Sequence, residues 1–471
     1  MKRIAIFTMT MAAVLSPCCG QDDSMAPDPA LDFPVTDAPR ELTPLMAREL
    51  RGCFDFFWNE WVSDPESPVY GMFCGDHVGL TTYPLVCPAE QGFYFTAIVV
   101  GVERGWIARD EGAERVLAAL KSFNKVECIN GFYYHFLDTK TGLRAWNENK
   151  GVALSNDCTA TMLSGAIVAS EYFGGEIKEL TDELYARVDW KWFTNPETDF
   201  PYLACYTDGA PTEKLAKLTN EEGFFLNWGF FGHHFNMFIL AAGAPNPEFA
   251  VGPKGYYAIE AEKGAYKGEE FIHCRIGCAF CYIWTHCFID FRNLEDRLGR
   301  NWFENSRHAA IAARQYAIDK GDEIKGLGPN SWGLSASIAP PKEGNLLGFG
   351  YSGMYGSAPF NPFYQPEEDG TVAPYASSGF VVFTPQESIA ALEYMYTIPG
   401  LVGEYGLYDS YSFETMADGD QPWIGNSYLG IDKGLVLPMF ENYSSQLIWK
   451  LAHRSAHIQR GLRNLEFKYS E

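Results

Sequence analysis

Positive charge is scarce in this 471-residue chain, and its absence narrows the range of partners. Asp and Glu number 60 against 36 Lys and Arg, which gives a formal net charge of −24. Such a balance argues against nucleic acid and against anionic membrane surfaces. It also disfavours a polyanionic glycan, whereas a neutral oligo- or polysaccharide carries no such penalty. We therefore expect a neutral glycan rather than nucleic acid as the partner.

Long apolar runs are also missing, because no segment has the 18 uncharged apolar residues of a membrane span. The longest candidate is at the N-terminus, where Lys2 and Arg3 precede a short apolar stretch and the pair Cys18 and Cys19. This pattern predicts a signal peptide over residues 1–18, alternatively a lipoprotein signal. The protein is then exported to the periplasm or the outer-membrane surface, and a lipid anchor would be its contact with the membrane.

Familiar catalytic motifs are absent as well. The chain contains no G-x-S-x-G, no H-E-x-x-H and no Walker loop. It has no βαβ rhythm and no repeat at a fixed short period. We expect neither a cofactor nor a metal.

One cysteine pattern needs a separate reading. Cys274, Cys278 and Cys281 match C-x-x-x-C-x-x-C, a spacing known from iron–sulfur sites. An exported protein is a poor host for such a cluster, and the spacing i, i+4, i+7 is also that of one helix face packed in a core. We favour buried thiols, with a zinc site that uses His273 or His286 as the alternative.

The other cysteines are scattered. Disulfides are one interpretation, with Cys74 and Cys87 as the best local pair. Buried thiols are the other interpretation, and the sequence does not separate the two.

Helical patterns dominate what the sequence does contain. Residues 19–43 are a linker rich in Pro and Asp, and residues 44–471 are expected to form one domain. Apolar and amphipathic segments alternate, which predicts an all-α (α/α)6 toroid of inner and outer helices, with a helical solenoid as the alternative. The predicted helices are 45–61, 93–102, 110–123, 154–172, 176–188, 233–242, 271–289, 303–319, 385–396 and 435–458. Long loops should build the rim of a cleft, at 62–92, 190–228, 321–383 and 398–434.

The stretch Gly223–Pro245 combines aromatic residues with two adjacent histidines, His233 and His234, at the start of an apolar helix. Flat aromatic side chains are suited to stacking on sugars. Two interpretations stand: a cleft-facing loop at a helix N-terminus, or a buried aromatic loop with core histidines.

Asp157 opens a predicted inner helix, with Ser155 or Asn156 as its N-cap. If the helix N-terminus faces the toroid cavity, the dipole would keep Asp157 ionised and suited to act as a general base. The simpler interpretation is a residue that only interacts with the helix dipole.

Glycoside hydrolysis needs two carboxyl groups across the bond. Glu222, Asp409 and Asp432 lie in glycine- and aromatic-rich loops and supply candidates, although each is also a normal turn or cap residue. His286 and Arg307 lie at helical positions, where a sugar site or a buried polar network would explain them equally.

Several strings together resemble the bacterial glucoamylase-like family that includes endo-β-1,2-glucanases. They run in collinear order over roughly residues 45–455 and include GVERGWI (101–107), GFYYHFLDTKTG (131–142), FIDFR (288–292), WFENSR (302–307), SWGLSAS (331–337), GLYDSYS (406–412) and YLGIDKG (428–434). The resemblance implies an (α/α)6 toroid, an exported glycan-degrading protein and inversion through an attacking water.

The resemblance assigns a cavity carboxylate to Asp157, in LSNDCT, where Cys158 intervenes before Thr159. It also reveals a departure. The family's favoured acid is a Glu in the loop before the next inner helix, and His233 stands in its place here. Glu222 is then the nearest replacement acid.

Three functions follow as hypotheses. The first is an O-glycosyl hydrolase on a neutral β-glucan, with Asp157 as base and His233 and Glu222 on the leaving-group side. The second is a non-catalytic glycan-binding surface lipoprotein on the same scaffold, and the third is a polysaccharide lyase. The predicted sugar-binding residues are Trp228, Phe231, His286, Arg307, Trp332, Tyr408, Asp409 and Asp432.

Overall fold

A computed structural model of the chain describes residues 38–75, 77–79, 85–145, 152–274, 278–340, 350–352, 370–415 and 417–469. The predicted signal peptide and most of the predicted linker lie outside these residues. No helix within the described part combines the length and apolarity that a bilayer crossing needs.

The structure is mostly helical, as the sequence predicts. The described residues form fifteen α-helices and two short 3-10 helices. They are α1 (Pro44–Asn59), α2 (Pro88–Glu103), α3 (Arg109–Phe123), α4 (Asn156–Phe173), α5 (Gly175–Ala186), α6 (Glu213–Ala216), α7 (Phe235–Ala242), α8 (Lys254–Ala258), α9 (Phe280–Ile283), η3 (Thr285–Cys287), α10 (Trp302–Lys320), α11 (Pro374–Gly379), η4 (Phe380–Val382), α12 (Pro385–Met395), α13 (Gly430–Ser444), α14 (Leu447–Arg454) and α15 (Ala456–Asn464).

Strands are short, and they pair in antiparallel ribbons of two or three. The chain is therefore less purely α-helical than predicted, but the ribbons are too small to form a central β-sheet. The strands are β1 (His77–Gly79), β2 (Leu85–Val86), β3 (Cys128–Ile129), β4 (Phe132–Tyr133), β5 (Leu137–Asp138), β6 (Ala204–Cys205), β7 (Phe224–Phe225), β8 (Lys263–Tyr266), β9 (Glu269–Ile272), β10 (Leu294–Glu295), β11 (Ser337–Ala339), β12 (Gly350–Ser352), β13 (Thr371–Val372), β14 (Val402–Gly403), β15 (Gly406–Leu407), β16 (Ser410–Ser412), β17 (Trp423–Gly425), β18 (Ser427–Leu429) and β19 (Lys468–Tyr469).

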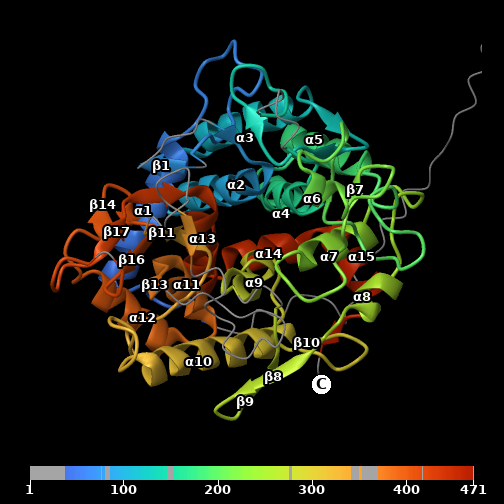
Figure 1. The fold of residues 1–471 in the computed structure, drawn as a ribbon. Helices are drawn as coiled ribbons and strands as arrows, with labels where there is room; N and C mark the ends of the chain where they lie inside the picture. The colour runs from blue at the N-terminus through green and yellow to red at the C-terminus, as the bar shows by residue number, and fades with distance from the viewer. Residues whose placement is uncertain are drawn as a thin grey trace, which may run out of the picture.

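The helices form two layers that differ in burial. Helix α2 is buried at every position from Pro88 to Gly101, whereas α5 buries Ile177, Thr181, Leu184 and Tyr185, which share one face. Neighbouring inner helices pack in the order α11, α13, α2, α4 and α7, and α12, α1, α3, α5 and α15 pack outside them. Figure 1 shows the same succession around the molecule. The sequence pattern thus predicted correctly which helices are covered and which are half exposed.

Two glycines explain the close packing of α2 against α4. A Cβ at Gly165 would lie 1.9 Å from the carbonyl oxygen of Gly92, and one at Gly92 would lie 2.1 Å from the carbonyl oxygen of Thr161. Any larger side chain would force the two backbones apart. The N-terminal ends of α2 and α4 are therefore held side by side.

Three helix predictions need correction. Residues 271–289 are not one helix: β9 ends at Ile272 and α9 begins at Phe280, with 275–277 outside the described residues. Residues 435–458 are divided among α13, α14 and α15, because Gln446 takes a left-handed conformation (φ 61°) that stops the helix. The predicted loop 321–383 contains α11, which is too short and too rich in Ser and Gly to show a period.

Helix α12 begins at Pro385, as predicted from the sequence. Thr384 is the N-cap residue and Pro385 is in the first turn. The Thr384 side chain forms no capping hydrogen bond, and its Oγ1 lies 3.3 Å from Ser388 Oγ instead. The sequence therefore located the boundary but not the hydrogen bond.

Candidate functional site

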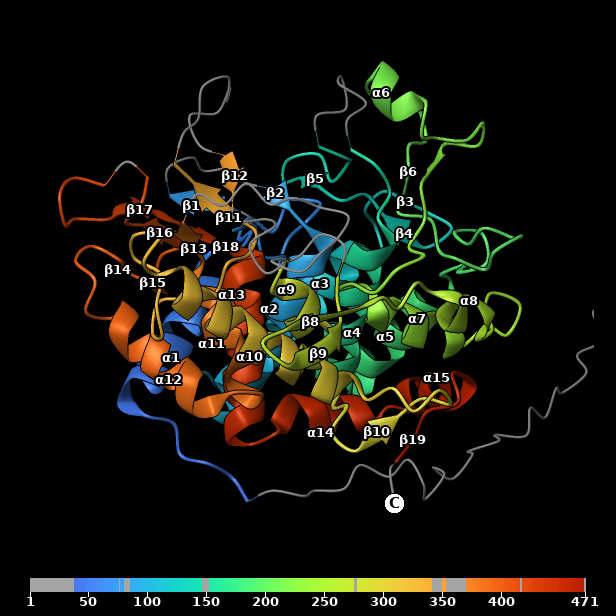
Figure 2. The same cartoon turned by 60° about the horizontal axis from the view of Figure 1, so that its bottom comes forward.

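Acidic side chains lie in the first turns of inner helices at one end of the molecule. Glu90 is in the first turn of α2, Asp157 in that of α4 and Asp432 in that of α13. The strand β2 precedes α2 directly and β18 precedes α13, and Figure 2 shows both strands at the end opposite α14. Because backbone N–H groups are unpaired at helix N-termini, this end suits anionic side chains.

Asp157 is held by three neighbours. Ser155 is the N-cap of α4 and its Oγ accepts from the N–H of Cys158, as expected of one of the two predicted caps. Asp157 Oδ1 accepts from the Cys158 N–H at 2.9 Å and from the Ser155 hydroxyl. Oδ2 lies 3.2 Å from His233 Nε2. Every oxygen of this carboxylate therefore has a partner in the protein.

The pKa of Asp157 reflects this environment. Burial would raise the pKa, but hydrogen bonds from His233 and Ser155 and the charges of His233 and His135 lower it below its ordinary value of 3.8. The side chain keeps 18% of its surface exposed, and that of His233 keeps 12%. Asp157 is thus an ionised carboxylate that solvent still reaches.

His233 lies among aromatic rings from three parts of the chain. Its ring centroid is 5.3 Å from Trp228, 5.0 Å from Phe280 and 5.3 Å from Trp284. Its Nε2 faces Asp157, whereas its Nδ1 is buried and has no hydrogen-bond partner among the described residues. The histidine is therefore oriented toward Asp157 and is covered on its other side.

His234 matches the second interpretation, that of a core residue. It is fully buried at the N-cap of α7 and stacks on Trp228 with centroids 4.2 Å apart. Burial, together with the charge of His233, lowers the pKa of His234 well below 6.5. The two adjacent histidines consequently have different environments: His233 is partly exposed and contacts Asp157, whereas His234 is in the core.

A cavity of about 350 Å³ opens beside Asp157. Its wall combines apolar and aromatic side chains with a few polar groups, and Asp157 is the one carboxylate among the described residues that line it. The lining residues are His135, Phe136, Val152, Ala153, Leu154, Ser155, Asp157, Leu203, Ala204, Tyr206, Phe225 and Trp228. An apolar wall with few polar groups is typical of a small-ligand site.

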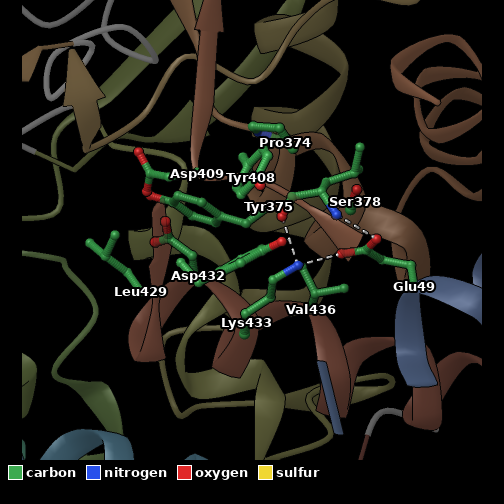
Figure 3. Close-up of a pocket in the computed structure, with 12 residues that line it drawn as sticks. Glu49, Pro374, Tyr375, Ser378, Tyr408, Asp409, Leu429, Asp432, Lys433 and Val436 are labelled. Carbon is green, nitrogen blue, oxygen red and sulfur yellow. Dashed lines mark hydrogen bonds and ion pairs between the residues drawn. The ribbon is translucent and has the colours of Figure 1, made fainter. Parts of the chain in front are cut away.

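A second, much smaller pocket of about 20 Å³ lies at the N-terminus of α13. Figure 3 shows Asp409, Asp432 and Tyr408 gathered on one side of it and Lys433 pointing toward Glu49 on the other. Asp409 Oδ2 accepts from the N–H of Ile338 at 2.6 Å. This volume has room for about one water molecule.

The two aspartates of this pocket both have raised pKa values. Burial raises the pKa of Asp432 well above 3.8, and the neighbouring Asp409 raises it further. Burial also raises the pKa of Asp409. Two like charges in a buried site disfavour double ionisation, which favours the protonated form of Asp432.

Lys433 belongs to a separate buried ion pair that joins α13 to α1. Its Nζ donates to Glu49 Oε1 at 2.7 Å and to the carbonyl of Leu407 at 2.8 Å. Glu49 Oε2 accepts from the hydroxyl of Tyr396 and from the N–H of Leu407. Both charges are fully hydrogen-bonded, which offsets the cost of burying them.

The predicted site residues therefore fall into three groups. Asp157 and Trp228 line the larger cavity, and His233 contacts Asp157 from behind that wall. Tyr408, Asp409 and Asp432 line the smaller pocket. The remaining predicted residues, Glu222, Phe231, His286, Arg307 and Trp332, line neither cavity.

Phe231, Trp332 and His286 are buried in the core, which contradicts their predicted role in sugar contact. Phe231 stacks on Trp302 with an interplanar angle of 2°, and Trp332 stacks on Phe380 at 11°. His286 Nε2 lies 3.0 Å from Ser306 Oγ, and burial lowers the pKa of His286 to about 3. A side chain without an exposed face has no surface to offer a sugar.

Glu222 and Arg307 are at the surface but away from both cavities. Glu222 lies on an exposed turn and does not line the Asp157 cavity. Tyr206 is the one residue that lines both that cavity and the shallow pocket beside Glu222. Arg307 pairs with Glu304 one turn earlier in α10, at 2.7 Å. The sequence did not show that the loop before Phe224 carries Glu222 outward.

The motif Cys274, Cys278 and Cys281 consists of buried thiols. The Sγ atoms of Cys274 and Cys281 lie 2.8 Å apart. No disulfide occurs among the described cysteines, so the predicted pair Cys74–Cys87 is wrong. Most of the described cysteines are instead buried thiols, as the alternative prediction had it, because the packed core surrounds their side chains.

Sequence reasoning missed Glu49, Tyr375 and Lys433 in the small pocket and His135 in the large one. Lys433 follows Asp432 directly in the first turn of a predicted inner helix, so the pair was a usable signal. His135 and Glu49 carry no such signal, because only the fold brings them to their sites.

Comparison with known proteins links part of the chain to one family. Residues 226–456 match the family described as "Putative glucoamylase". The match includes His233 and also Asp409 and Asp432 of the small pocket.

A curated relative supports the same assignment. The chain is 24% identical over 419 residues to the exo-β-1,2-glucooligosaccharide sophorohydrolase (non-reducing end) of Parabacteroides distasonis. The alignment covers 81% of this chain and 53% of the relative, so the chain spans about half the length of that protein.

Solved structures share the fold over nearly the whole chain. An endo-β-1,2-glucanase from Chitinophaga pinensis, in complex with sophorotriose and glucose, has 25% identity and a TM-score of 0.74, with 91% of this chain and 99% of that chain covered. A putative glucoamylase from Bacteroides uniformis has 24% identity and a TM-score of 0.75, with the same coverage. The homologues thus include β-1,2-glucan glycoside hydrolases.

Proposed function

We propose that the protein is an exported glycoside hydrolase that cleaves a neutral β-glucan, with β-1,2-linked glucan as the first substrate to test. The observation that carries the proposal is Asp157, an ionised carboxylate on the wall of a cavity that Trp228 also lines. We also infer that the two helical layers form an (α/α)6 toroid whose cavity is this one. The relatives named above act on β-1,2-glucan or its oligosaccharides.

Asp157 is suited to be the general base. A base takes a proton from water while the water oxygen attacks the anomeric carbon, the glycosidic bond breaks, and the leaving oxygen receives a proton from an acid. The lowered pKa keeps Asp157 ionised and able to accept that proton. Inversion follows, because water attacks from the face opposite the leaving group.

His233 is better suited to positioning than to direct proton transfer. Its Nε2 is engaged with Asp157 and its Nδ1 is buried, so neither nitrogen is directed to the cavity. A His–Asp contact fixes the orientation of the carboxylate and favours its charged form. We therefore assign His233 the role of holding Asp157, in place of the leaving-group role that its position in the sequence suggests.

A second function has its own supporting observation. Asp157 is the one carboxylate among the described residues that line the large cavity, whereas glycoside hydrolysis uses two. A glycan-binding protein without hydrolytic activity would need the aromatic wall but not the second acid. The replacement of the family's Glu by His233 favours the same alternative.

The experiment separates the two functions by measuring binding and cleavage independently. Calorimetry with β-1,2-glucooligosaccharides measures binding, and reducing-end release with chromatography measures cleavage. Hydrolysis that Asp157→Asn abolishes, with binding retained, supports the enzyme. Binding without hydrolysis in the wild type, followed by hydrolysis in His233→Glu, supports the binding protein.

Absence of both binding and cleavage across neutral β-glucans would overturn the proposal. A product that absorbs ultraviolet light from an acidic glycan would indicate a lyase instead. The anomeric configuration of the first product, read by NMR, tests inversion directly.

A further inference from the structure

Three side chains with metal-binding atoms meet between α2 and α4, beside the Asp157 cavity. The ligand atoms of Cys87, His135 and Cys158 all lie within 4.8 Å of one another. Among the residues that the structure describes, this is the one group of three His, Cys, Asp or Glu side chains close enough to hold a metal ion. The C-x-x-x-C-x-x-C motif, which suggested a metal from sequence, is not such a group.

Backbone packing brings the three residues together. Cys87 is the N-cap of α2 and follows β2, whose Val86 pairs with Leu137 in β5. His135 lies two residues before Leu137, and its N–H donates to the carbonyl of Ala153 at 2.9 Å. Cys158 is in the first turn of α4, which packs tightly on α2. The cluster is thus set by a strand pairing and a helix contact.

The donor set suits zinc. Two thiolates and one imidazole match a tetrahedral Zn²⁺ site with one open position. Bond lengths of about 2.3 Å to sulfur place two ligand sulfurs about 3.8 Å apart. The observed upper limit of 4.8 Å exceeds this by about 1 Å, which side-chain rotation can close.

We propose that Cys87, His135 and Cys158 bind one zinc ion whose fourth position opens toward the Asp157 cavity. The two cysteines are buried and His135 is exposed on the cavity wall. The buried sulfurs close the inner side of the site, so the side next to His135 remains for water or a ligand. The site links α2 to α4, and its ligand Cys158 is the residue that follows Asp157 in the sequence.

This site does not depend on the proposed hydrolysis. Zinc binding would be measured on a protein that cleaves nothing, and cleavage could fail while the metal is held. In an oxidising compartment, a disulfide between Cys87 and Cys158 is the competing state of the same two thiols. The experiment must distinguish zinc from that disulfide.

The test uses the full chain, purified without chelators and dialysed against Zn²⁺. Mass spectrometry of the metal should give about one zinc per chain in the wild type and less than about a tenth in Cys158→Ser or Cys87→Ser, since a two-ligand site binds weakly. Co²⁺ should give the thiolate charge-transfer and d–d absorption of a tetrahedral site in the wild type. Both absorption bands should be lost in the two variants.

His135→Gln is the most informative variant, because an exposed side chain can change without disturbing the core. It should lower zinc content and abolish the rise in melting temperature that Zn²⁺ gives the wild type. Cys287→Ser is the matched control, since Cys287 is a buried thiol outside the cluster, with its Sγ 3.7 Å from the carbonyl oxygen of Ile283. It should keep full zinc content.

Three results would overturn the proposal. One is unchanged zinc content in both His135→Gln and Cys158→Ser. Another is an equal loss of zinc in Cys287→Ser. The third is a peptide map in which Cys87 and Cys158 are joined as a disulfide while the protein is fully folded.

Discussion

The first turns of α4 and α13 each contain an aspartate, yet the two carboxyl groups have opposite pKa shifts. Asp157 in α4 has a lowered pKa because His233 and Ser155 donate to it. Asp432 in α13 has a raised pKa because burial and the carboxylate of Asp409 disfavour its charge. The same helix dipole acts on both residues.

The comparison shows that the dipole does not decide the protonation state here. Local partners do, because a hydrogen bond or a like charge within a few ångströms outweighs a terminal partial charge. Asp157 opens on a cavity large enough for a sugar, whereas Asp432 faces a pocket with room for about one water. Chemistry with a substrate is therefore expected at α4, and a structural role at α13.

Asp157→Asn should have the largest effect on activity. Loss of the base should lower kcat on a cleaved β-glucan by about 10²- to 10⁴-fold. Asp432→Asn is the matched variant in the first turn of α13, and it should retain most activity because Asn resembles a protonated Asp. Steady-state kinetics on both variants test this. Equal losses would mean that the two positions do not differ in function.

Lys433→Met should have the largest effect on stability. It leaves Glu49 buried without its cation, which should lower the free energy of unfolding by about 3–5 kcal/mol. The side chains of Glu49 and Lys433 are only 3% and 6% exposed. Urea unfolding followed by circular dichroism measures the change.

Two further variants serve as controls for Lys433. Lys263→Met breaks an exposed pair with Glu270 on the hairpin of β8 and β9, and it should cost less than about 1 kcal/mol. The double variant Lys433→Met with Glu49→Met should recover much of the loss, because no buried charge remains. A single Lys433→Met variant as stable as the Lys263→Met variant would contradict the assigned ion pair.

The dependence of stability on pH should distinguish Asp432 from an aspartate with a lowered pKa. Asp409, Lys433 and Glu90 are the charged groups whose fields act on Asp432. Above pH 3.8, the folded state holds a proton on Asp432 that the unfolded chain releases. The contribution of Asp432 to stability is therefore fully present below the ordinary pKa of 3.8, and it is lost as pH rises toward the raised pKa of the folded state. The slope is at most about 1.4 kcal/mol per pH unit.

Asp432→Asn should therefore become more stable relative to the wild type as pH rises above 3.8, the ordinary pKa of an aspartate. Asp182→Asn should show the opposite trend. Burial alone would raise the pKa of Asp182, but the hydrogen bond from His457 and the charges of His457 and Lys178 together lower it. Its contribution is present above the ordinary pKa and is lost as pH falls. Parallel pH profiles for the two variants would show that the pKa of Asp432 is not raised.

Ser155→Ala should have the smallest of these effects. It removes the N-cap hydrogen bond of α4 and one donor to Asp157, and should cost about 1 kcal/mol of stability. Thr384→Ala is the comparison at the N-cap of α12, where the side chain makes no capping hydrogen bond, so the loss should be smaller. Thermal unfolding of both variants measures the difference, and a larger loss for Thr384→Ala would contradict it.

Much of the fold follows from local pattern. The sequence shows that α2 is apolar along its length and that α5 has apolar residues on one face. These two patterns indicate whether a helix is covered on all sides or half exposed. The short helix α11 was not visible, because six residues of Pro, Ser, Ala and Gly show no period. The break at Gln446 was not visible either, since a left-handed residue other than glycine has no reliable local signature.

The site was only partly predictable for a related reason. Asp157 and His233 each stand next to a helix start, which the sequence reveals one at a time. Their 3.2 Å contact joins residues 76 positions apart and depends on how α4 packs against α7. Phe231 and Trp332 were predicted to bind sugar because composition reports aromatic side chains but not which of them the fold covers.

The sequence by itself determined the helical class and the acidic balance, and it predicted the export signal, because each is read from residue type and local spacing. The tertiary structure alone decided that the pKa of Asp157 is lowered while that of Asp432 is raised, that His234 is core while His233 is not, and that Cys87, His135 and Cys158 meet. Those properties depend on distances between segments far apart in the chain, and electrostatic and coordinate bonds act only over a few ångströms.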